Sequence, residues 1–146
     1  MPATSRLRIL RTVRFCAGHR YHSAALSEEQ NREVFGACNR PHGHGHNYRL
    51  EVGVEGPVDP VTGMVINLAD LDKLLRKIVV EKLDHSFLNY DVEYFADLIP
   101  SCENLVRYLW SVLEQPIAEL GECRLSLIRL WESEDLYAEL EKEPSQ

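Results

Sequence analysis

The chain has 146 residues, of which 45% are hydrophobic and 27% are charged, and its formal net charge is −7. This composition is typical of a globular domain with a core of its own and excludes collagen-like, disulfide-scaffold and disordered chains. No stretch approaches the roughly 18 apolar residues of a membrane span, and the overall negative charge lacks the basic footprint of a nucleic-acid-binding protein. We therefore expect a single domain over residues 1–146 that contacts neither membrane nor nucleic acid.

The first residues lack the apolar block of a secretory signal, which favours a cytoplasmic protein. The four cysteines form no Cys-x-x-Cys pair, so in a reducing compartment they are expected to be free thiols. Charge is uneven along the chain: up to Arg49 there are eight arginines and three glutamates. An anionic small molecule can therefore bind near the N-terminal half despite the negative total.

Two strands and a long polar connection are predicted in the first part of the chain. Apolar and polar residues alternate over residues 7–19, which predicts a half-buried strand ending at His19. A cleaner alternation over residues 44–54 predicts a second strand, whose apolar face begins with His44 and His46. The connection over residues 20–41 is long for a compact domain, and such connections are often functional.

The remaining elements suggest a sheet with helices on one face. Residues 64–66 predict a short return strand, and Asn67 caps a helix that ends near residues 83–85. A second helix begins after Ser101 and is expected to stop at Pro116. Strands are predicted over residues 124–131 and 136–140. The order β-β-α-α-β-β indicates an α+β fold.

Histidines indicate a metal site. Five of the six lie between residues 19 and 46, and three of these alternate with glycine over residues 42–46. Residues two apart on a strand share a face, so alternate imidazoles can converge on one ion. His19 is the best third ligand, since three protein ligands leave open the position that catalytic zinc needs. The alternative is a loose patch of surface histidines. Zn²⁺ suits imidazole ligands best among the abundant ions, although iron, nickel and copper also fit.

Other reactive side chains allow two interpretations each. Cys38 is either a buried small residue or, beside a dication and Arg40, a thiolate that acts as nucleophile or base. Asp84 and His85 form either a helix end or a proton relay. Glu132, after an apolar run, is either solvated or a ligand for the N–H groups of a heterocycle. Glu103 is interpreted first as an acid at a helix N-terminus.

Taken together, these motifs resemble the 6-pyruvoyl-tetrahydropterin synthase family. The matching stretches follow the family order over nearly the whole chain, and their combination is highly specific. They are residues 15–19, 34–48, 59–64, 67–68, 83–85, 94–97, 102–104 and 131–133.

The resemblance implies the tunnelling fold (T-fold), a four-stranded antiparallel sheet with two helices on one face. Trimers of such sheets close into barrels and stack as a homohexamer, with active sites at subunit contacts. The implied enzyme is a zinc-dependent lyase that converts 7,8-dihydroneopterin triphosphate to 6-pyruvoyl-tetrahydropterin and releases triphosphate. Mg²⁺ often accompanies triphosphate, but no motif for it can be read in the sequence.

Site roles also follow from the resemblance, residue by residue. Zinc is expected on His19, His44 and His46, with Cys38 as the base and His85 and Asp84 assisting. The pterin ring is expected on Glu132, with the Cys102–Glu103 region contributing to its pocket. The triphosphate has four candidate cations, between which the sequence does not choose: Arg14, Arg20, Arg32 and Arg40.

Two alternatives stay open. The 6-carboxy-tetrahydropterin synthases of queuosine biosynthesis share substrate and zinc site but have a shorter loop, Cys-x3-His-Gly-His. Here Cys38 precedes His44 by the longer loop, although His42 also allows the shorter register. We prefer His44 and His46 because Asn47 and Tyr48 follow in the family position. The second alternative is a non-catalytic T-fold protein that binds zinc or pterins.

Overall fold

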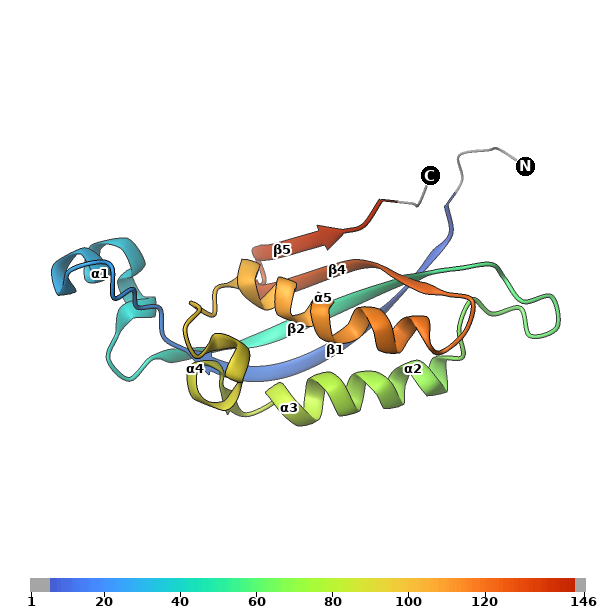
Figure 1. Cartoon of the computed structure of the whole chain (residues 1–146), viewed down its shortest axis with the longest axis horizontal. Helices are drawn as coiled ribbons and strands as arrows, with labels where there is room; N and C mark the ends of the chain where they lie inside the picture. Colours follow the sequence, from blue (N-terminus) through green and yellow to red (C-terminus); the bar gives the residue numbers. More distant parts are fainter. Residues whose placement is uncertain (1–5, 144–146) are drawn as a thin grey trace.

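A computed structural model describes residues 6–143, which form one five-stranded sheet with helices packed on one of its faces (Figure 1). The strand order is β3-β1-β2-β4-β5. The long strands pair antiparallel, and they are β1 (Arg8–His19), β2 (His44–Glu55), β4 (Arg124–Ser133) and β5 (Leu136–Glu141). The α+β prediction is confirmed. Residues 1–5, on which the absence of a signal sequence partly depended, and 144–146 lie outside the described residues.

The prediction of four strands was wrong by one. A two-residue strand, β3 (Ser86–Phe87), pairs parallel with Ala17 and Gly18 of β1 and makes the sheet mixed. It is too short to show alternation, so the sequence could not reveal it. Its effect is to bring the chain just after Asp84 and His85 against the outer edge of β1.

Helices α2 and α5 cover the face of the sheet that carries the core. Helix α2 (Leu68–Leu75) continues through a π-helical segment, η2 (Arg76–Val80), into α3 (Glu81–Leu83), and α5 spans Cys102–Ala118. Alternate residues of β2 and the helix stripes are almost completely buried. This apolar face accounts for the main stabilisation of the fold. Its central members are Leu50, Val52, Val54, Leu71, Leu75, Leu105, Leu109 and Leu113.

Two local predictions were wrong. Residues 64–66 form no strand; Asp59 closes a turn with Val61 and Thr62 instead, and the main chain of Met64 accepts only the Asp59 N–H. Pro116 does not stop its helix, which runs on to Ala118. The following residue, Ile117, is completely buried, so core packing holds the last turn in spite of the missing N–H.

The long connection between β1 and β2 is ordered. It contains α1 (Glu28–Phe35) and a 3₁₀ turn, η1 (Gly36–Asn39). Ser27 and Gln30 form a capping box at the start of α1. The buried amide of Asn31 donates to the main-chain oxygens of Ser23, Leu26 and Ser27. Local hydrogen bonds therefore fix a segment that protrudes from one end of the sheet (Figure 1).

Two short elements complete the path, α4 (Leu88–Asp91) and the 3₁₀ turn η3 (Glu93–Phe95). They lie between α3 and α5, and both bury an apolar residue in the core. No helix among residues 6–143 combines the length and the apolar composition that crossing a bilayer requires.

Candidate metal centre and active site

Three histidines meet where β1 ends and β2 begins. In the antiparallel register, His19 lies directly opposite His44, and His46 lies opposite Ala17. Directly opposite residues share a face of the sheet, as do residues two apart on one strand. Pairing of the two strands therefore brings all three imidazoles to one place, as the sequence predicted. His42 lies outside this group and is exposed, so the longer Cys38–His44 register is the one that the structure supports.

The glycines of the histidine run allow this close pairing. A Cβ atom on Gly43 would lie 2.6 Å from the main-chain oxygen of His19, and the residue has a φ of 68°. A Cβ on Gly45 would lie 2.9 Å from the oxygen of Ala17. Both positions therefore require glycine, the first for its left-handed backbone as well as for space.

The imidazoles have the arrangement of metal ligands. One nitrogen from each of the three rings lies within 4.8 Å of the others. The Nε2 atoms of His19, His44 and His46 are buried, and within residues 6–143 none of them has a hydrogen-bond partner. Buried polar atoms normally find partners, so three convergent unpaired nitrogens fit a bound cation. The residues present therefore suit a metal ion.

Tyr48 orients one of the three histidines. Its buried hydroxyl lies 3.0 Å from Nδ1 of His19. With Nδ1–H donating to that oxygen, the Nε2 lone pair of His19 points into the cluster, which is how outer residues orient metal-binding histidines. Tyr48 lies on the same strand face as His44 and His46, and that spacing could have revealed its role from the sequence.

Burial and mutual repulsion favour the neutral form of two of the histidines, His19 and His44, because both effects lower the pKa. Desolvation, followed by the charges of His46 and His44, lowers the pKa of His19 to about 3. Desolvation also lowers the pKa of His44, and Arg40 contributes to the same direction. A neutral imidazole is the form that binds a metal ion. Below neutral pH these two side chains are therefore still available as ligands.

Glu132 lies beside the cluster but is not a member of it. Its carboxylate is almost buried, with Oε1 3.1 Å from Nε2 of His46 and 3.8 Å from Nε2 of His19. The pairing of β4 with β5 shifts by one residue between Trp131 and Ser133, so Glu132 occupies a β-bulge. Bulges of this kind re-aim side chains next to active sites.

Cys38, in the η1 turn, is linked to the histidines through Tyr21. The main-chain N–H of Tyr21 donates to the carbonyl of Cys38 at 2.7 Å, and the Tyr21 ring contacts that of His19 with centroids 4.6 Å apart. Burial, and secondly the charge of Glu132, raises the pKa of the Cys38 thiol. Arg40 has no part in this shift, contrary to our expectation, and the protein without an ion therefore keeps the thiol protonated.

One pocket joins Cys38 to the N-terminus of α5. It has a volume of about 450 Å³ and is lined by Tyr21, Cys38, Ser101 and Glu103 among others. Cys38 and Glu103, two of the predicted site residues, thus line the same pocket. Cys102, by contrast, is buried, and its thiol donates to the main-chain oxygen of Leu130; burial raises its pKa to about 12. Its thiol is therefore directed at the sheet.

Asp84 and His85 form a pair at the outer edge of β1. Nδ1 of His85 lies 3.0 Å from Oδ2 of Asp84, whose Oδ1 accepts the main-chain N–H of Cys16. That N–H and the His85 charge lower the pKa of Asp84. The His85 side chain is 83% exposed, and its backbone has a φ of 61°. Among the described residues, no hydrogen bond or ion pair links the pair to Cys38.

These observations define the class of the molecule: an α+β protein with three histidines on its sheet whose arrangement suits a metal ion, and with a cysteine and a carboxylate nearby. The family model for 6-pyruvoyl tetrahydropterin synthase matches residues 8–143. The chain belongs to this family.

Named relatives agree with the family match. A 6-pyruvoyl tetrahydrobiopterin synthase from Poecilia reticulata is 54% identical over 102 residues, which is 70% of this chain and 69% of the relative. The Homo sapiens protein of that name is 48% identical over 107 residues, or 73% of this chain and 74% of the relative. The solved 6-pyruvoyl tetrahydropterin synthase from Caenorhabditis elegans is 33% identical, with a TM-score of 0.84 over 98% of this chain and all of that one.

Proposed function

We propose that the protein is a zinc-dependent lyase that converts 7,8-dihydroneopterin triphosphate to 6-pyruvoyl-tetrahydropterin with release of triphosphate. The observation that carries the proposal is the meeting of three unpaired imidazole nitrogens next to Cys38 and Glu132. Relatives at 48–54% identity bear the name of this activity. A purely structural metal site would need the histidines but neither of the other two side chains.

His19, His44 and His46 would hold the zinc ion, leaving a ligand position for the substrate. The ion would supply Lewis-acid polarisation of the side-chain hydroxyls of the substrate and would also stabilise a nearby thiolate. Because burial raises the pKa of Cys38, that stabilisation matters: the thiolate needs a neighbouring positive charge that the chain alone does not supply.

The protein residues then have separate tasks. The carboxylate of Glu132 accepts N–H groups of the pterin ring and fixes its orientation, which places the side-chain carbons of the substrate near Cys38. The Cys38 thiolate removes a proton from one of these carbons. Glu103, in the same pocket as Cys38, borders the space for the ring. Cys102 is the first residue of α5, between two residues of the pocket wall, Ser101 and Glu103, and its own thiol is directed at Leu130.

Asp84 and His85 assist in proton transfer from a neighbouring subunit. Within residues 6–143 no hydrogen bond or ion pair links them to Cys38; Asp84 is half-buried, whereas His85 is exposed and has a left-handed backbone conformation. Unusual backbone conformations of this kind collect at functional sites. A cytoplasmic homohexamer, built from two barrel-forming trimers, would bring this pair to the site of another copy.

The deciding experiment identifies the product by mass after the zinc-loaded protein reacts with 7,8-dihydroneopterin triphosphate. A pyruvoyl product with triphosphate supports the proposal. A carboxy product with acetaldehyde would instead make the protein a 6-carboxy-tetrahydropterin synthase, against the longer loop from Cys38 to His44. No triphosphate despite bound zinc would indicate a non-catalytic binding protein.

A further inference from the structure

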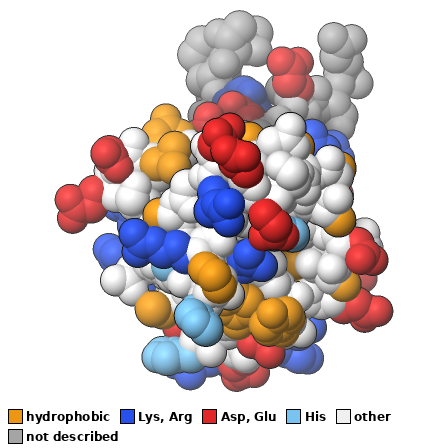
Figure 2. Space-filling model, turned by 90° about the vertical axis from the view of Figure 1, so that its left-hand side faces the viewer, with side chains coloured by type: hydrophobic (Ala, Val, Ile, Leu, Met, Phe, Trp, Pro, Cys, Tyr) orange, Lys and Arg blue, Asp and Glu red, His pale blue; other side chains and the backbone are white. Residues whose placement is uncertain are grey.

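A basic pocket of about 350 Å³ lies next to the metal centre, between the end of β1 and the protruding α1–η1 segment. Arg20, Arg32 and Arg40 line it, and Glu28 is the acidic residue on its wall. Figure 2 shows this end of the molecule, where Lys and Arg side chains gather close to histidines. The pocket therefore has an excess of positive charge.

The three guanidinium groups have no carboxylate partner. Among residues 6–143, the ion pairs of arginine are made by other positions, namely Arg6, Arg8, Arg11, Arg49, Arg124 and Arg129. Three like charges placed around one cavity repel one another unless an anion lies between them. Guanidinium groups bind phosphate oxygens with paired hydrogen bonds, so a phosphorylated ligand suits the cavity best.

The arginines are positioned by rigid neighbours. The main-chain N–H and carbonyl of Arg20 both pair with the side chain of Asn89 at 2.8 Å, and its Nε donates to the carbonyl of Asn39. Arg32 lies on the capped helix α1. The carbonyl of Arg40 accepts the N–H of Gly43 at 2.9 Å. The backbones of this cradle are therefore formed before any ligand arrives.

The pocket also borders the metal centre. Asn39 lies on its wall, immediately after Cys38, and donates to the main-chain oxygen of Tyr21. Arg20, also on its wall, immediately follows the histidine His19. A ligand that spans both sites would thus place its reacting carbons at the metal centre and its anionic end among the arginines.

We propose that this pocket binds the polyphosphate end of the substrate, with Arg32 and Arg40 as principal contacts and Arg20 as their fixed neighbour. The identity of the whole ligand rests on the proposed function, whereas the preference for a polyphosphate rests on the pocket. Of the four cations that the sequence left open, Arg14 does not line this pocket; it lines another one, together with Arg49, His46 and Glu132.

The test is a calorimetric titration of the full-length protein with sodium tripolyphosphate. EDTA is present because tripolyphosphate would otherwise bind through the metal ion. We expect Arg32→Gln and Arg40→Gln each to weaken binding about tenfold, as for one charge-assisted contact, and Arg32→Lys to restore part of the loss. Arg76→Gln removes an exposed, unpaired arginine on another helical segment and should bind like the wild type. Inorganic phosphate should bind far more weakly than tripolyphosphate.

Several results would overturn the proposal: no tripolyphosphate binding by the wild type, unchanged binding in both variants, or an equal loss in Arg76→Gln, which would reveal a mere net-charge effect. Circular dichroism confirms that each variant folds. In turnover assays, Arg32→Gln should raise KM about tenfold and leave kcat nearly unchanged. Normal turnover with an unaltered KM would reject the pocket and leave the proposed function intact. Tripolyphosphate binding that depends on both arginines, without turnover, would reject the function and support the pocket.

Discussion

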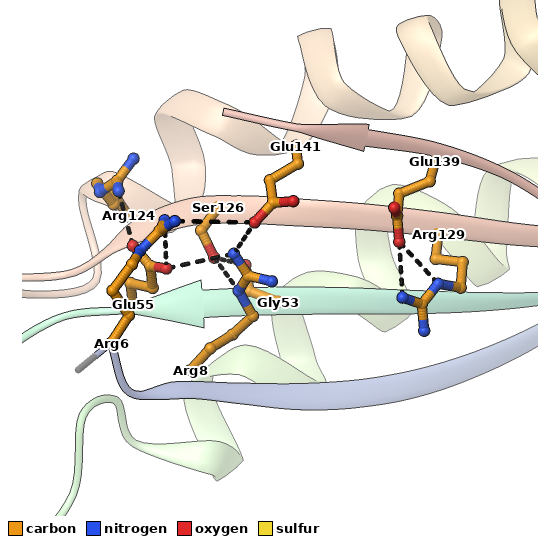
Figure 3. A network of polar contacts seen from close by, with 9 residues as sticks. All are labelled: Arg6, Arg8, Gly53, Glu55, Arg124, Ser126, Arg129, Glu139 and Glu141. Carbon is orange, nitrogen blue, oxygen red and sulfur yellow. Dashed lines mark hydrogen bonds and ion pairs between the residues drawn. The ribbon is translucent and has the colours of Figure 1, made fainter. Parts of the chain in front are cut away.

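Polar and charged side chains at the two ends of strands β1, β2 and β4 differ in whether the chain itself pairs them. Where β1 begins and β2 ends, Glu55 is almost buried and receives Arg6, Arg8 and Arg124 at 2.7, 3.3 and 2.6 Å (Figure 3). Where β1 ends and β2 begins, the Nε2 atoms of three histidines have no hydrogen-bond partner among the described residues, and Arg20, Arg32 and Arg40 have no carboxylate partner there.

The comparison separates structural polar groups from functional ones. At the Glu55 end the carboxylate is paired by three arginines of the chain itself, and Arg124 Nη1 is the one buried side-chain atom of this network without a hydrogen-bond partner among the described residues. Leaving many polar groups unpaired costs stability, and a fold tolerates that cost where a ligand later satisfies them. We therefore propose that the end with the unpaired groups is the one that binds metal and anion.

The largest expected effect comes from breaking the unpaired end at a ligand. His46→Ala should lose bound metal and reduce triphosphate release by about 10³-fold or more, since Lewis-acid stabilisation is worth several kcal/mol. His42→Ala is the matched control, because His42 is exposed and outside the cluster. Metal analysis and turnover measure both. Metal loss in the control alone would force the shorter Cys38–His42 register.

Cys38→Ala tests whether the thiol belongs to the chemistry or to the packing. We expect metal content and folding to stay the same and turnover to fall by about 10²–10⁴-fold, the usual contribution of a general base. Cys123→Ala removes another partly buried thiol, which bonds to the carbonyl of Ile117 away from the histidines. Equal turnover in Cys38→Ala and wild type would remove Cys38 from the mechanism.

A substitution at the Glu55 end should change the stability of the fold and leave metal binding unchanged. Glu55→Gln removes the charge shared by three arginines and should lower the free energy of unfolding by about 2 kcal/mol. Urea denaturation measures this loss, and metal content of the folded variant should stay the same. If Glu55→Gln lost metal before it unfolded, the functional separation of the two ends would be wrong.

Tyr48→Phe sharpens the role of the residue behind the metal centre. It keeps the stacked contact with Phe15 but removes the hydroxyl next to His19. Metal affinity should fall about 10- to 100-fold, as for other groups that orient a ligand. Tyr90→Phe, at an 86% exposed position, is the control and should bind metal normally. Competition with a coloured chelator gives both affinities, and equal values would leave Tyr48 with a packing role only.

The stability of the metal-free protein should depend on pH through His19. In the unfolded chain His19 gains its proton near pH 6.5, whereas burial holds the folded pKa at about 3. The unfolded state therefore binds more protons in this window, so stability is complete above about pH 6.5 and declines as the pH falls toward 3. Urea midpoints of the metal-free protein at pH 7.5 and 5 measure the decline. His19→Gln should reduce it, and an undiminished decline would assign it to other groups.

The sequence alone determined the four long strands, the two helices that cover the core and the meeting of His19, His44 and His46. Alternation over residues 44–54 requires one buried face, and the spacing of His44 and His46 places both on that face whatever surrounds them. His19 followed because its strand ends on the same apolar side. The roles of Asp84, His85 and Glu132 came from motifs shared with a family, since a carboxylate at a strand end has no periodic signal of its own.

Features that depend on contacts between residues distant in the chain could be recognised only in the tertiary structure. The strand at Ser86–Phe87 is too short to be seen before it meets β1, and Pro116 stays helical because the core buries Ile117. The choice among four arginines required knowing which of them share a cavity, because a charge becomes a binding group only when its neighbours leave it unpaired. Local patterns report which face a side chain takes, whereas burial and partnership depend on residues distant in the chain.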